Sequence, residues 1–184
     1  MSHINKLIIV LMVCVSSLAG AQQVNWTTIE KASQTSSDKI YMIDFYTDWC
    51  GYCKKMDRET FSNPVVAKIL NRYYTPVKFN AEGNATFTWG ERKYVPTPTP
   101  KGSRPAVHMF AKAVLGQKIG FPTFAFFAPD QSLLTLVQGY NNANDFAMIL
   151  WYFASGDNKK YSFDHYTAIF DKEIKPVMKK ELGL

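Results

Sequence analysis

The 184-residue sequence contains only 3 cysteines, 10 glycines and 9 prolines. Three cysteines are too few for a small domain that depends on disulfides for its stability. So little glycine and proline, in a chain that is 47% apolar, excludes a disordered or collagen-like protein. Aromatic residues make up 15% of the chain, which is enough for a sizeable core. We therefore expect one globular domain with extensions.

Charge of one sign is not concentrated in any segment. The formal net charge is +6, and the 21 Lys and Arg residues are scattered along the chain rather than massed in one run. A mildly basic, scattered surface gives little attraction to a nucleic-acid backbone. We therefore expect no nucleic-acid partner, and we expect a monomer.

A long hydrophobic run occurs only near the N-terminus. Lys6 is followed by the uncharged apolar residues 7–15 and then by small residues up to Ala21. This order is typical of a secretory signal peptide, and the run is shorter than the roughly 18 apolar residues of a membrane anchor. The pattern predicts that residues 1–21 are cleaved and that the protein is exported, to the periplasm or another oxidising space.

Apolar periodicity predicts alternating strands and helices in the rest of the chain. Strands are expected over 39–46, 76–80, 123–127 and 133–138, and helices over 26–36, 50–61, 64–73, 104–115 and 142–153. Residues 81–101 lack periodicity, contain prolines and are expected to form a long loop. The order describes a small α/β layer fold with a mixed sheet.

The C-terminal residues 155–184 carry a helical pattern of their own. Apolar side chains recur on one face, with lysines opposite: Tyr166, Ile169, Phe170, Ile174, Val177 and Met178. Pro176 should bend or end this helix. Such a stripe favours packing against the chain's own domain, with a partner or a membrane surface as the alternative.

The chemistry is expected at two cysteines. Cleavage of the signal peptide would remove Cys14 and leave Cys50 and Cys53. Cys50 lies where a buried strand ends and a helix begins, so it faces free backbone N–H groups and the positive end of the helix dipole. That field favours the thiolate of Cys50. Cys53, one turn later, could attack a mixed disulfide formed at Cys50.

Two other interpretations of these cysteines are weaker. A purely structural bridge would close a very short loop and contribute only about 2 kcal/mol. A zinc site would need two more ligands, and His108 and His165 are isolated histidines with no second cysteine pair. We therefore expect a redox-active Cys50–Cys53 pair, with no metal and no other cofactor.

These residues resemble a known family. Residues 44–55 (DFYTDWCGYCKK) are similar to the active-site segment of the thioredoxin superfamily. Asp44, six residues before Cys50, resembles the buried acid of that family, and Lys78 resembles the lysine near that acid. Residues 120–123 (GFPT) resemble the loop that carries the family's cis-proline.

The resemblance covers roughly residues 24–153. Residues 57–65 are especially similar to the C-terminal thioredoxin-like domain of the bacterial transmembrane thiol–disulfide interchange protein. The resemblance implies a thioredoxin-like α/β fold, with a central mixed sheet flanked by helices. The domain would span 22–154, with an insertion at about 82–117 before the cis-proline strand and a C-terminal helical extension over 155–184.

The resemblance also implies a division of catalytic roles. Cys50 would attack a substrate disulfide, and Cys53 would resolve the mixed disulfide. Desolvation on a buried strand would raise the pKa of Asp44, which could then accept the proton of Cys53 through water. The alternative is an Asp44 carboxylate that is simply paired with Lys78.

Other residues are expected to form the substrate site. If Pro122 is cis, it places the backbone of Phe121 against the cysteines, where it would hydrogen-bond an extended substrate strand. Trp49, Gly51 and Tyr52 are expected to shield and shape the site. The alternative for the two aromatic residues is an ordinary position in the core.

The chain departs from simple thioredoxins in two respects. The 41 residues between Asn80 and Pro122 are more than simple thioredoxins have there. This insertion could form a wall near the site, with Trp89, Tyr94 and Pro96 touching a client, or it could be decorative. The dipeptide Gly-Tyr between the cysteines is similar to that of the periplasmic disulfide isomerase.

The sequence therefore predicts an exported thioredoxin-like thiol–disulfide oxidoreductase that reduces or interchanges disulfides of other exported proteins. A membrane electron-donor thiol–disulfide protein would have to return it to the reduced state. The alternatives are an isomerase or oxidase with the same residues, or a non-catalytic binding module that keeps only the fold.

Overall fold

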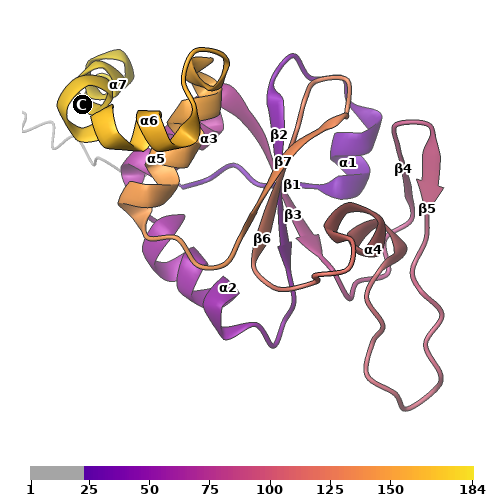
Figure 1. Ribbon diagram of the computed structural model, residues 1–184. Coiled ribbons are helices and arrows are strands. Elements are labelled where there is room, and N and C mark those ends of the chain that lie inside the picture. The colour runs from indigo at the N-terminus through magenta and orange to yellow at the C-terminus, as the bar shows by residue number, and fades with distance from the viewer. Residues whose placement is uncertain (1–22) are drawn as a thin grey trace, which may run out of the picture.

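A five-stranded mixed sheet lies at the centre of the structure (Figure 1). The computed structural model describes residues 23–184, so the signal peptide expected over 1–21, and Cys14 within it, lie outside the described residues. In spatial order the strands are β1 Thr27–Thr28, β3 Tyr74–Asn80, β2 Ile40–Tyr46, β6 Thr123–Phe127 and β7 Leu133–Gln138. β1, β3 and β2 are parallel to one another, β6 is antiparallel to β2, and β7 is antiparallel to β6. The predicted mixed sheet is therefore confirmed.

Helices cover both faces of this sheet, which Figure 1 shows edge-on. α2 and its continuation, α3 and α5 lie on one side, and α1 and α4 lie on the other. Their bounds are α1 Ile29–Gln34, α2 Gly51–Lys55, α3 Pro64–Tyr73, α4 Met109–Leu115 and α5 Ala143–Ala154. Side chains alternate along β2, so Met42 enters the core beneath α3 and α5, while Tyr41 and Ile43 enter the core beneath α1 and α4.

The central position of β2 follows from its composition. Every residue from Tyr41 to Phe45 is buried, as a continuous apolar run predicts for a strand covered on both faces. Asp44 is the one charged residue in that run, and the register places it between Lys78 on β3 and Phe124 on β6.

The segment expected to be a long loop contains a hairpin. β4 Phe87–Trp89 and β5 Arg92–Tyr94 pair antiparallel around a turn at Gly90, whose φ of 60° suits glycine. Phe87 and Trp89 point into the core beneath α1 and α4. Trp89 is only 5% exposed, so the idea that it touches a client is wrong.

Two predicted helices are shorter than expected. The helix expected over 26–36 spans only α1, because Thr27 and Thr28 pair with β3 and the Thr28 side chain caps the helix. The helix expected over 104–115 begins only at Met109, capped by His108. Residues 95–108 form a long connection instead, which we call the arm.

The helix that follows the cysteines changes its winding. α2 continues without a break into a π-helical turn, η1 Met56–Thr60, in which the N–H of Phe61 donates to the carbonyl of Met56 at 2.9 Å. The helix expected over 50–61 is thus present, with a wider last turn. That turn carries Asp57 toward the sheet, where it meets Lys78.

The C-terminal extension packs on its own domain. It consists of the 3-10 turn η2 Asp157–Lys159, α6 Phe163–Ile169, the π-helical turn η3 Phe170–Ile174 and α7 Lys175–Leu182. Tyr166, Phe170 and Met178 are buried in the core beneath α3 and α5, which confirms the predicted stripe. Val177 is the exception, with an exposed fraction of 58%. Pro176 is the second residue of α7, directly after the π-helical turn η3, and α7 continues to Leu182, so the helix does not end at this proline.

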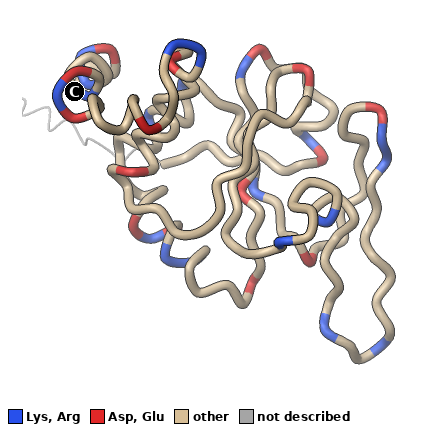
Figure 2. Tube along the Cα trace, viewed as in Figure 1, with Lys and Arg blue, Asp and Glu red and all other residues tan. Residues whose placement is uncertain are grey.

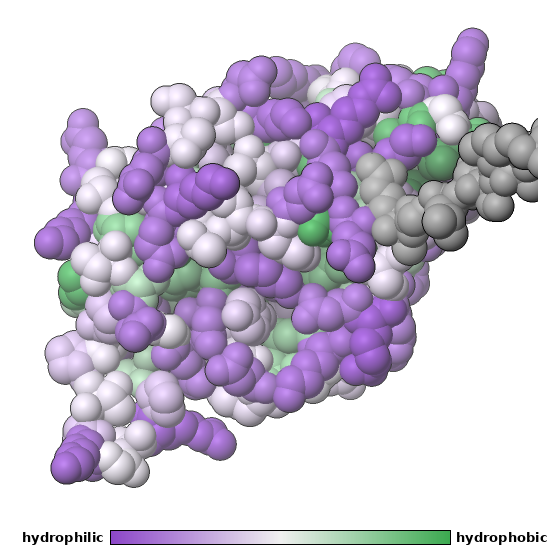
Figure 3. Space-filling view, turned by 180° about the vertical axis from the view of Figure 1, so that it is seen from behind, coloured by the Kyte–Doolittle hydropathy of each residue, from purple (hydrophilic) through white to green (hydrophobic). Residues whose placement is uncertain are grey.

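Within residues 23–184, no helix has both the length and the apolar character needed to cross a bilayer. Hydrophilic side chains cover most of the face seen from behind, with apolar groups visible between them (Figure 3).

The start of α5 allows a test of the fold. The side chain of Asn142 accepts hydrogen bonds from the N–H groups of Asn144 and Asp145, both at 3.0 Å. Replacing Asn142 by Ala should lower the free energy of unfolding by about 1 kcal/mol, because two N–H groups lose their acceptor. Urea denaturation checks this value, with Asn84→Ala, at an exposed position of the insertion, as the control. Equal effects of the two substitutions would contradict the capping role.

Candidate active site at the start of helix α2

Cys50 and Cys53 form a disulfide at the point where α2 begins. β2 ends at Tyr46, and a turn in which the N–H of Cys50 donates to the carbonyl of Thr47 at 3.1 Å leads into the helix. Cys50 is the N-cap residue of α2, and its Sγ accepts a hydrogen bond from the N–H of Cys53 at 3.0 Å. The sulfur of Cys50 therefore occupies the position where a negative charge is best stabilised.

The loop before β6 carries a cis-proline and contacts the residue that precedes Cys50. The peptide bond between Phe121 and Pro122 is cis, as the resemblance implied. β6 starts at Thr123, which pairs with Phe45 near the end of β2. The ring of Phe121 meets the ring of Trp49 edge-on, with 6.2 Å between the centroids. The structure thus brings the cis-proline loop next to the residue that precedes Cys50.

Asp44 and Lys78 form an ion pair beneath the helix that follows the cysteines. Nζ of Lys78 lies 2.7 Å from Oδ2 of Asp44, which is 1% exposed. Burial raises the pKa of Asp44 from 3.8 to about 6, although Lys78 acts in the opposite direction. Oδ1 of Asp44 is buried and has no hydrogen-bond partner among residues 23–184. That oxygen is the one free to take up a proton.

Lys78 has a second carboxylate partner, which the sequence interpretation missed. Its Nζ lies 2.6 Å from Oδ1 of Asp57, in the π-helical turn after α2. Burial alone would lower the pKa of Lys78, but the charges and hydrogen bonds of Asp44 and Asp57 outweigh it and raise that pKa. Asp57 follows Cys53 by four residues, one helical turn, and this spacing was the available signal. Lys78 therefore stays charged and pairs with both carboxylates.

Two exposed aromatic side chains flank the disulfide. Trp49 and Tyr52 have exposed fractions of 56% and 63%, so neither is an ordinary core aromatic, whereas Cys50 is only 4% exposed. The ring of Tyr52 lies 6.3 Å from that of Tyr140. A Cβ added at Gly51 would meet nothing within 4 Å, so open space lies over the first residue of α2.

The insertion touches this site through residues that the sequence did not single out. Nε1 of Trp49 donates to Oε2 of Glu82 at 2.9 Å, and the guanidinium carbon of Arg104 lies 5.7 Å from the centroid of the Trp49 ring. Glu82 and Arg104 lie far apart in the sequence of the insertion, so no pattern in the sequence shows that they converge. Of the residues expected to meet a client there, Tyr94 and Pro96 are half-buried.

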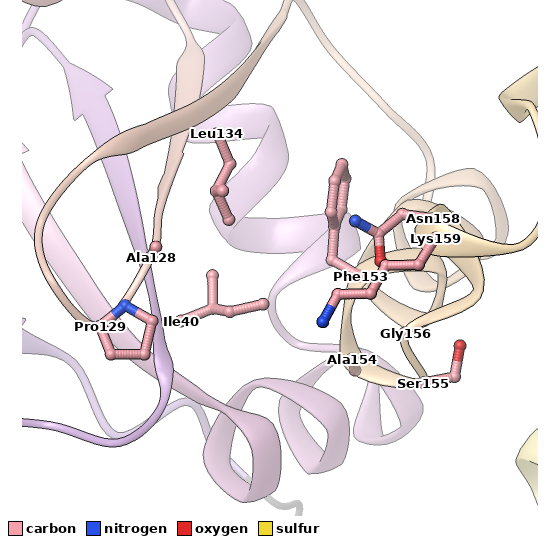
Figure 4. Close-up of a pocket in the computed structure, with 10 residues that line it drawn as sticks. All are labelled: Ile40, Ala128, Pro129, Leu134, Phe153, Ala154, Ser155, Gly156, Asn158 and Lys159. Atoms are coloured by element: carbon pink, nitrogen blue, oxygen red, sulfur yellow. The ribbon is translucent and has the colours of Figure 1, made fainter.

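A cavity elsewhere in the fold is separate from the disulfide. Figure 4 shows this space of about 390 Å³, with Ile40, Pro129 and Lys159 among the residues that line it. Ile40 is the first residue of β2, whereas Cys50 follows the end of that strand. The cavity and the cysteines therefore lie at opposite ends of the sheet.

The histidine in the insertion has a structural place. His108 is fully buried, one ring nitrogen accepts the N–H of Phe110 at 3.1 Å, and the other lies 2.9 Å from the carbonyl oxygen of Ala85. Burial lowers the pKa of His108, which favours the neutral ring. Across the described residues, no three His, Cys, Asp or Glu side chains gather as a metal site.

The sequence is similar to known interchange proteins over about a quarter of its length. The sequence is 44% identical to the thiol:disulfide interchange protein DsbD of Photorhabdus laumondii over 46 residues, which are 25% of this chain. It is 38% identical to the protein of the same name from Salmonella typhi over 47 residues, which are 24% of this chain. Each match covers only 8% of the relative's length.

Solved structures share the fold at low sequence identity. A thioredoxin-fold protein from Helicobacter pylori is 12% identical, with 85% of this chain and 89% of that chain covered and a TM-score of 0.51. A thioredoxin from Thermus thermophilus is 17% identical, with 77% and 98% covered and a TM-score of 0.50.

The family described as thioredoxin-like domain matches residues 27–154, from β1 to the end of α5. This range contains the disulfide, the Asp44–Lys78 pair and the cis-proline loop. A Cys-x-x-Cys pair with this support can exchange its disulfide with another thiol, which makes the chain a thiol–disulfide oxidoreductase in general terms. The chain belongs to the thioredoxin-like domain family.

Proposed function

We propose that the chain is an exported protein-disulfide reductase, or interchange protein, that acts on other exported proteins. The observation that carries this proposal is the Cys50–Cys53 disulfide at the start of α2, with the buried, partly unpaired carboxyl of Asp44 behind it. The N-terminal pattern of residues 1–21 supports export.

The reaction begins with the reduced pair. The Cys50 thiolate attacks one sulfur of a client disulfide, the client S–S bond breaks, and the other client sulfur leaves as a thiolate. The N–H of Cys53, which donates to Sγ of Cys50, stabilises the attacking thiolate. Because Cys50 is flanked by exposed Trp49 and Tyr52, a client reaches it between these two side chains.

The second step releases the client. Asp44, as a carboxylate, takes the proton of the Cys53 thiol through a water molecule, and the Cys53 thiolate attacks Sγ of Cys50. The mixed disulfide breaks, the second client sulfur leaves as a thiolate, and the Cys50–Cys53 disulfide forms again. Two electrons have passed from this chain to the client.

A further turnover needs a dithiol donor. In an oxidising space that donor must draw electrons from elsewhere, and a membrane thiol–disulfide protein meets this need. The partial likeness to the interchange protein DsbD supports such a partner for this chain.

The reduction potential of the Cys50–Cys53 pair tests the direction of electron flow. We expect a value near the −270 mV of thioredoxin, because the chain retains Asp44 and Lys78 and has no His between the cysteines. Equilibration with glutathione or dithiothreitol buffers, followed by thiol labelling and mass spectrometry, gives this potential. A potential of about −120 mV would instead indicate an oxidase, and a potential of about −180 mV would indicate an isomerase.

A further inference from the structure

Hydrogen bonds and prolines restrict the conformation of the arm, residues 95–108. The hydroxyl of Thr97 donates to the carbonyl of Val107 at 2.6 Å, and the hydroxyl of Thr99 accepts from the N–H of Ala106 at 3.1 Å. Prolines fix φ along both of its sides, at Pro96, Pro98, Pro100 and Pro105. The two sides of the arm are therefore tied together, and little backbone freedom remains to be lost when it binds a client.

The arm projects beside the active site and carries positive charge only. The arm extends from the domain at the lower right of Figure 1, at the edge of the sheet where α2 begins. In the view from behind it protrudes at the lower left (Figure 3). Its charged residues are Lys101 and Arg104, and Figure 2 shows blue and no red along it. The guanidinium of Arg104 lies over the ring of Trp49, which precedes Cys50.

The guanidinium of Arg104 is free to bind an anion. Among residues 23–184, no carboxylate oxygen lies within 4.0 Å of it, and Arg104 is exposed. The guanidinium contacts the face of the Trp49 ring, so its N–H groups remain available as donors. Two of them can bind one carboxylate in a bidentate hydrogen bond.

The two nearby carboxylates, of Glu82 and Asp48, do not pair with Arg104, because each accepts a hydrogen bond from another side chain. Glu82 accepts from Nε1 at the edge of the Trp49 ring, and Asp48 accepts from Nδ2 of Asn80 at 3.2 Å. Lys54, which follows Cys53 in α2, is exposed and forms no ion pair within residues 23–184. The arm and the first turns of α2 therefore each carry a positive side chain without a carboxylate partner.

We propose that Arg104 is a specificity-determining residue, which selects client segments carrying a carboxylate side chain next to their disulfide. The segment would lie along the cis-proline loop, with its acidic side chain against the arm and its sulfur at Cys50. This inference rests on the proposed function, because it assigns a substrate class to the same site. It also gives the insertion a role as a wall of that site.

A set of matched substrates tests the inference. Three disulfide-bonded peptides differ only in the residue beside one cysteine, which is Glu, Gln or Lys. The reduced protein is mixed with each peptide at low salt, and the second-order rate constant of reduction is measured by rapid quench and chromatography. We expect the Glu peptide to react about fivefold faster than the Lys peptide, the factor that one exposed ion pair of about 1 kcal/mol gives.

Substitutions at Arg104 separate charge recognition from a structural role. Arg104→Gln should reduce the ratio of the Glu to the Lys rate constant, Arg104→Lys should retain part of it, and Arg104→Glu should invert it. A residue that merely supports Trp49 would change all three rate constants alike. The ratio should also shrink in high salt, because the Debye length falls from about 30 Å at 0.01 M to about 3 Å at 1 M.

Arg92→Gln is the matched control. Arg92 also stacks on an aromatic ring of the insertion, that of Tyr94 at 5.2 Å, but it follows the turn at Gly90, which contacts Gln131 at the far end of the sheet. The ratio should be unchanged in this variant. An unaltered ratio in Arg104→Gln, or an equal loss in Arg92→Gln, would overturn the inference while the proposed function stands. If wild-type protein reduced none of the three peptides, the proposed function itself would fail.

Discussion

Replacing Cys50 by Ala will reduce insulin disulfide reduction to the background rate of the chemical reductant alone. Cys50 is the N-cap of α2, and its Sγ is the sulfur that receives a backbone N–H, so it is the thiol whose anion the fold stabilises. Without that nucleophile the first bond to the client cannot form. Insulin precipitation in the presence of dithiothreitol measures the loss.

Replacing Cys53 by Ala will have a different outcome. Cys50 can still attack, but no second thiol is present to release the client, so a covalent complex with the substrate accumulates. The complex appears as a larger band on a non-reducing gel and disappears when reductant is added. Circular dichroism of both variants controls for folding. Equal activity of the two variants, or a trapped complex in the Cys50 variant, would refute the assigned roles.

The site could be predicted from the sequence wherever it depends on neighbours along the chain. The strand that ends at Tyr46 and the helix that begins after Cys50 are both clear patterns, so the position of the cysteines at a helix start followed directly. Asp44 was identified through the family resemblance, from its position six residues before Cys50, and its burial follows from its place in a continuous apolar strand. Its pairing with Lys78 came from the family resemblance, and the register of β2 with β3 is what brings it about.

The parts that were missed depend on contacts between distant segments. Phe87, Thr88 and Trp89 alternate between buried and exposed as a strand should, but three residues are too short a pattern to stand out beside the prolines that follow. The convergence of Glu82 and Arg104 on Trp49 depends on how the insertion folds back on the domain. Helical spacing likewise placed Val177 in the C-terminal stripe, although the π-helical turn η3 shifts the face that follows it.

Replacing Asp44 by Asn will slow the release of clients from Cys50. As the general base for Cys53, the Asp44 carboxylate should accelerate resolution by a factor on the order of 10². It can accept a proton only when ionised, so the wild-type resolution rate should fall as the pH drops through about 6, the raised pKa of Asp44. Stopped-flow measurement of resolution across this pH range should show that the Asp44→Asn variant lacks the step.

The variant Asp57→Asn provides the control for that experiment. It removes the other carboxylate partner of Lys78 but leaves Asp44 in place, so the step near pH 6 should persist. The nearby charge of Asp57 helps to raise the pKa of Asp44, so its removal should move the step to a slightly lower pH. Loss of the step in this variant, or its persistence in Asp44→Asn, would contradict the role of Asp44 as the base.

The substitution Asp44→Asn should also remove a pH dependence of the protein's stability. The folded protein retains the Asp44 proton between pH 3.8 and about 6, where the unfolded chain has released it, so the stability falls as the pH rises through this window. The pKa of Asp44 is about 6 in the folded protein and 3.8 in the unfolded chain, and this difference corresponds to about 3 kcal/mol. At about pH 8 the ionised carboxylate lowers the free energy of unfolding by this amount. Asn cannot ionise and avoids that cost, while Lys78 keeps Asp57 as a partner. Urea denaturation should therefore show that Asp44→Asn gains stability over wild type at about pH 8 relative to about pH 4.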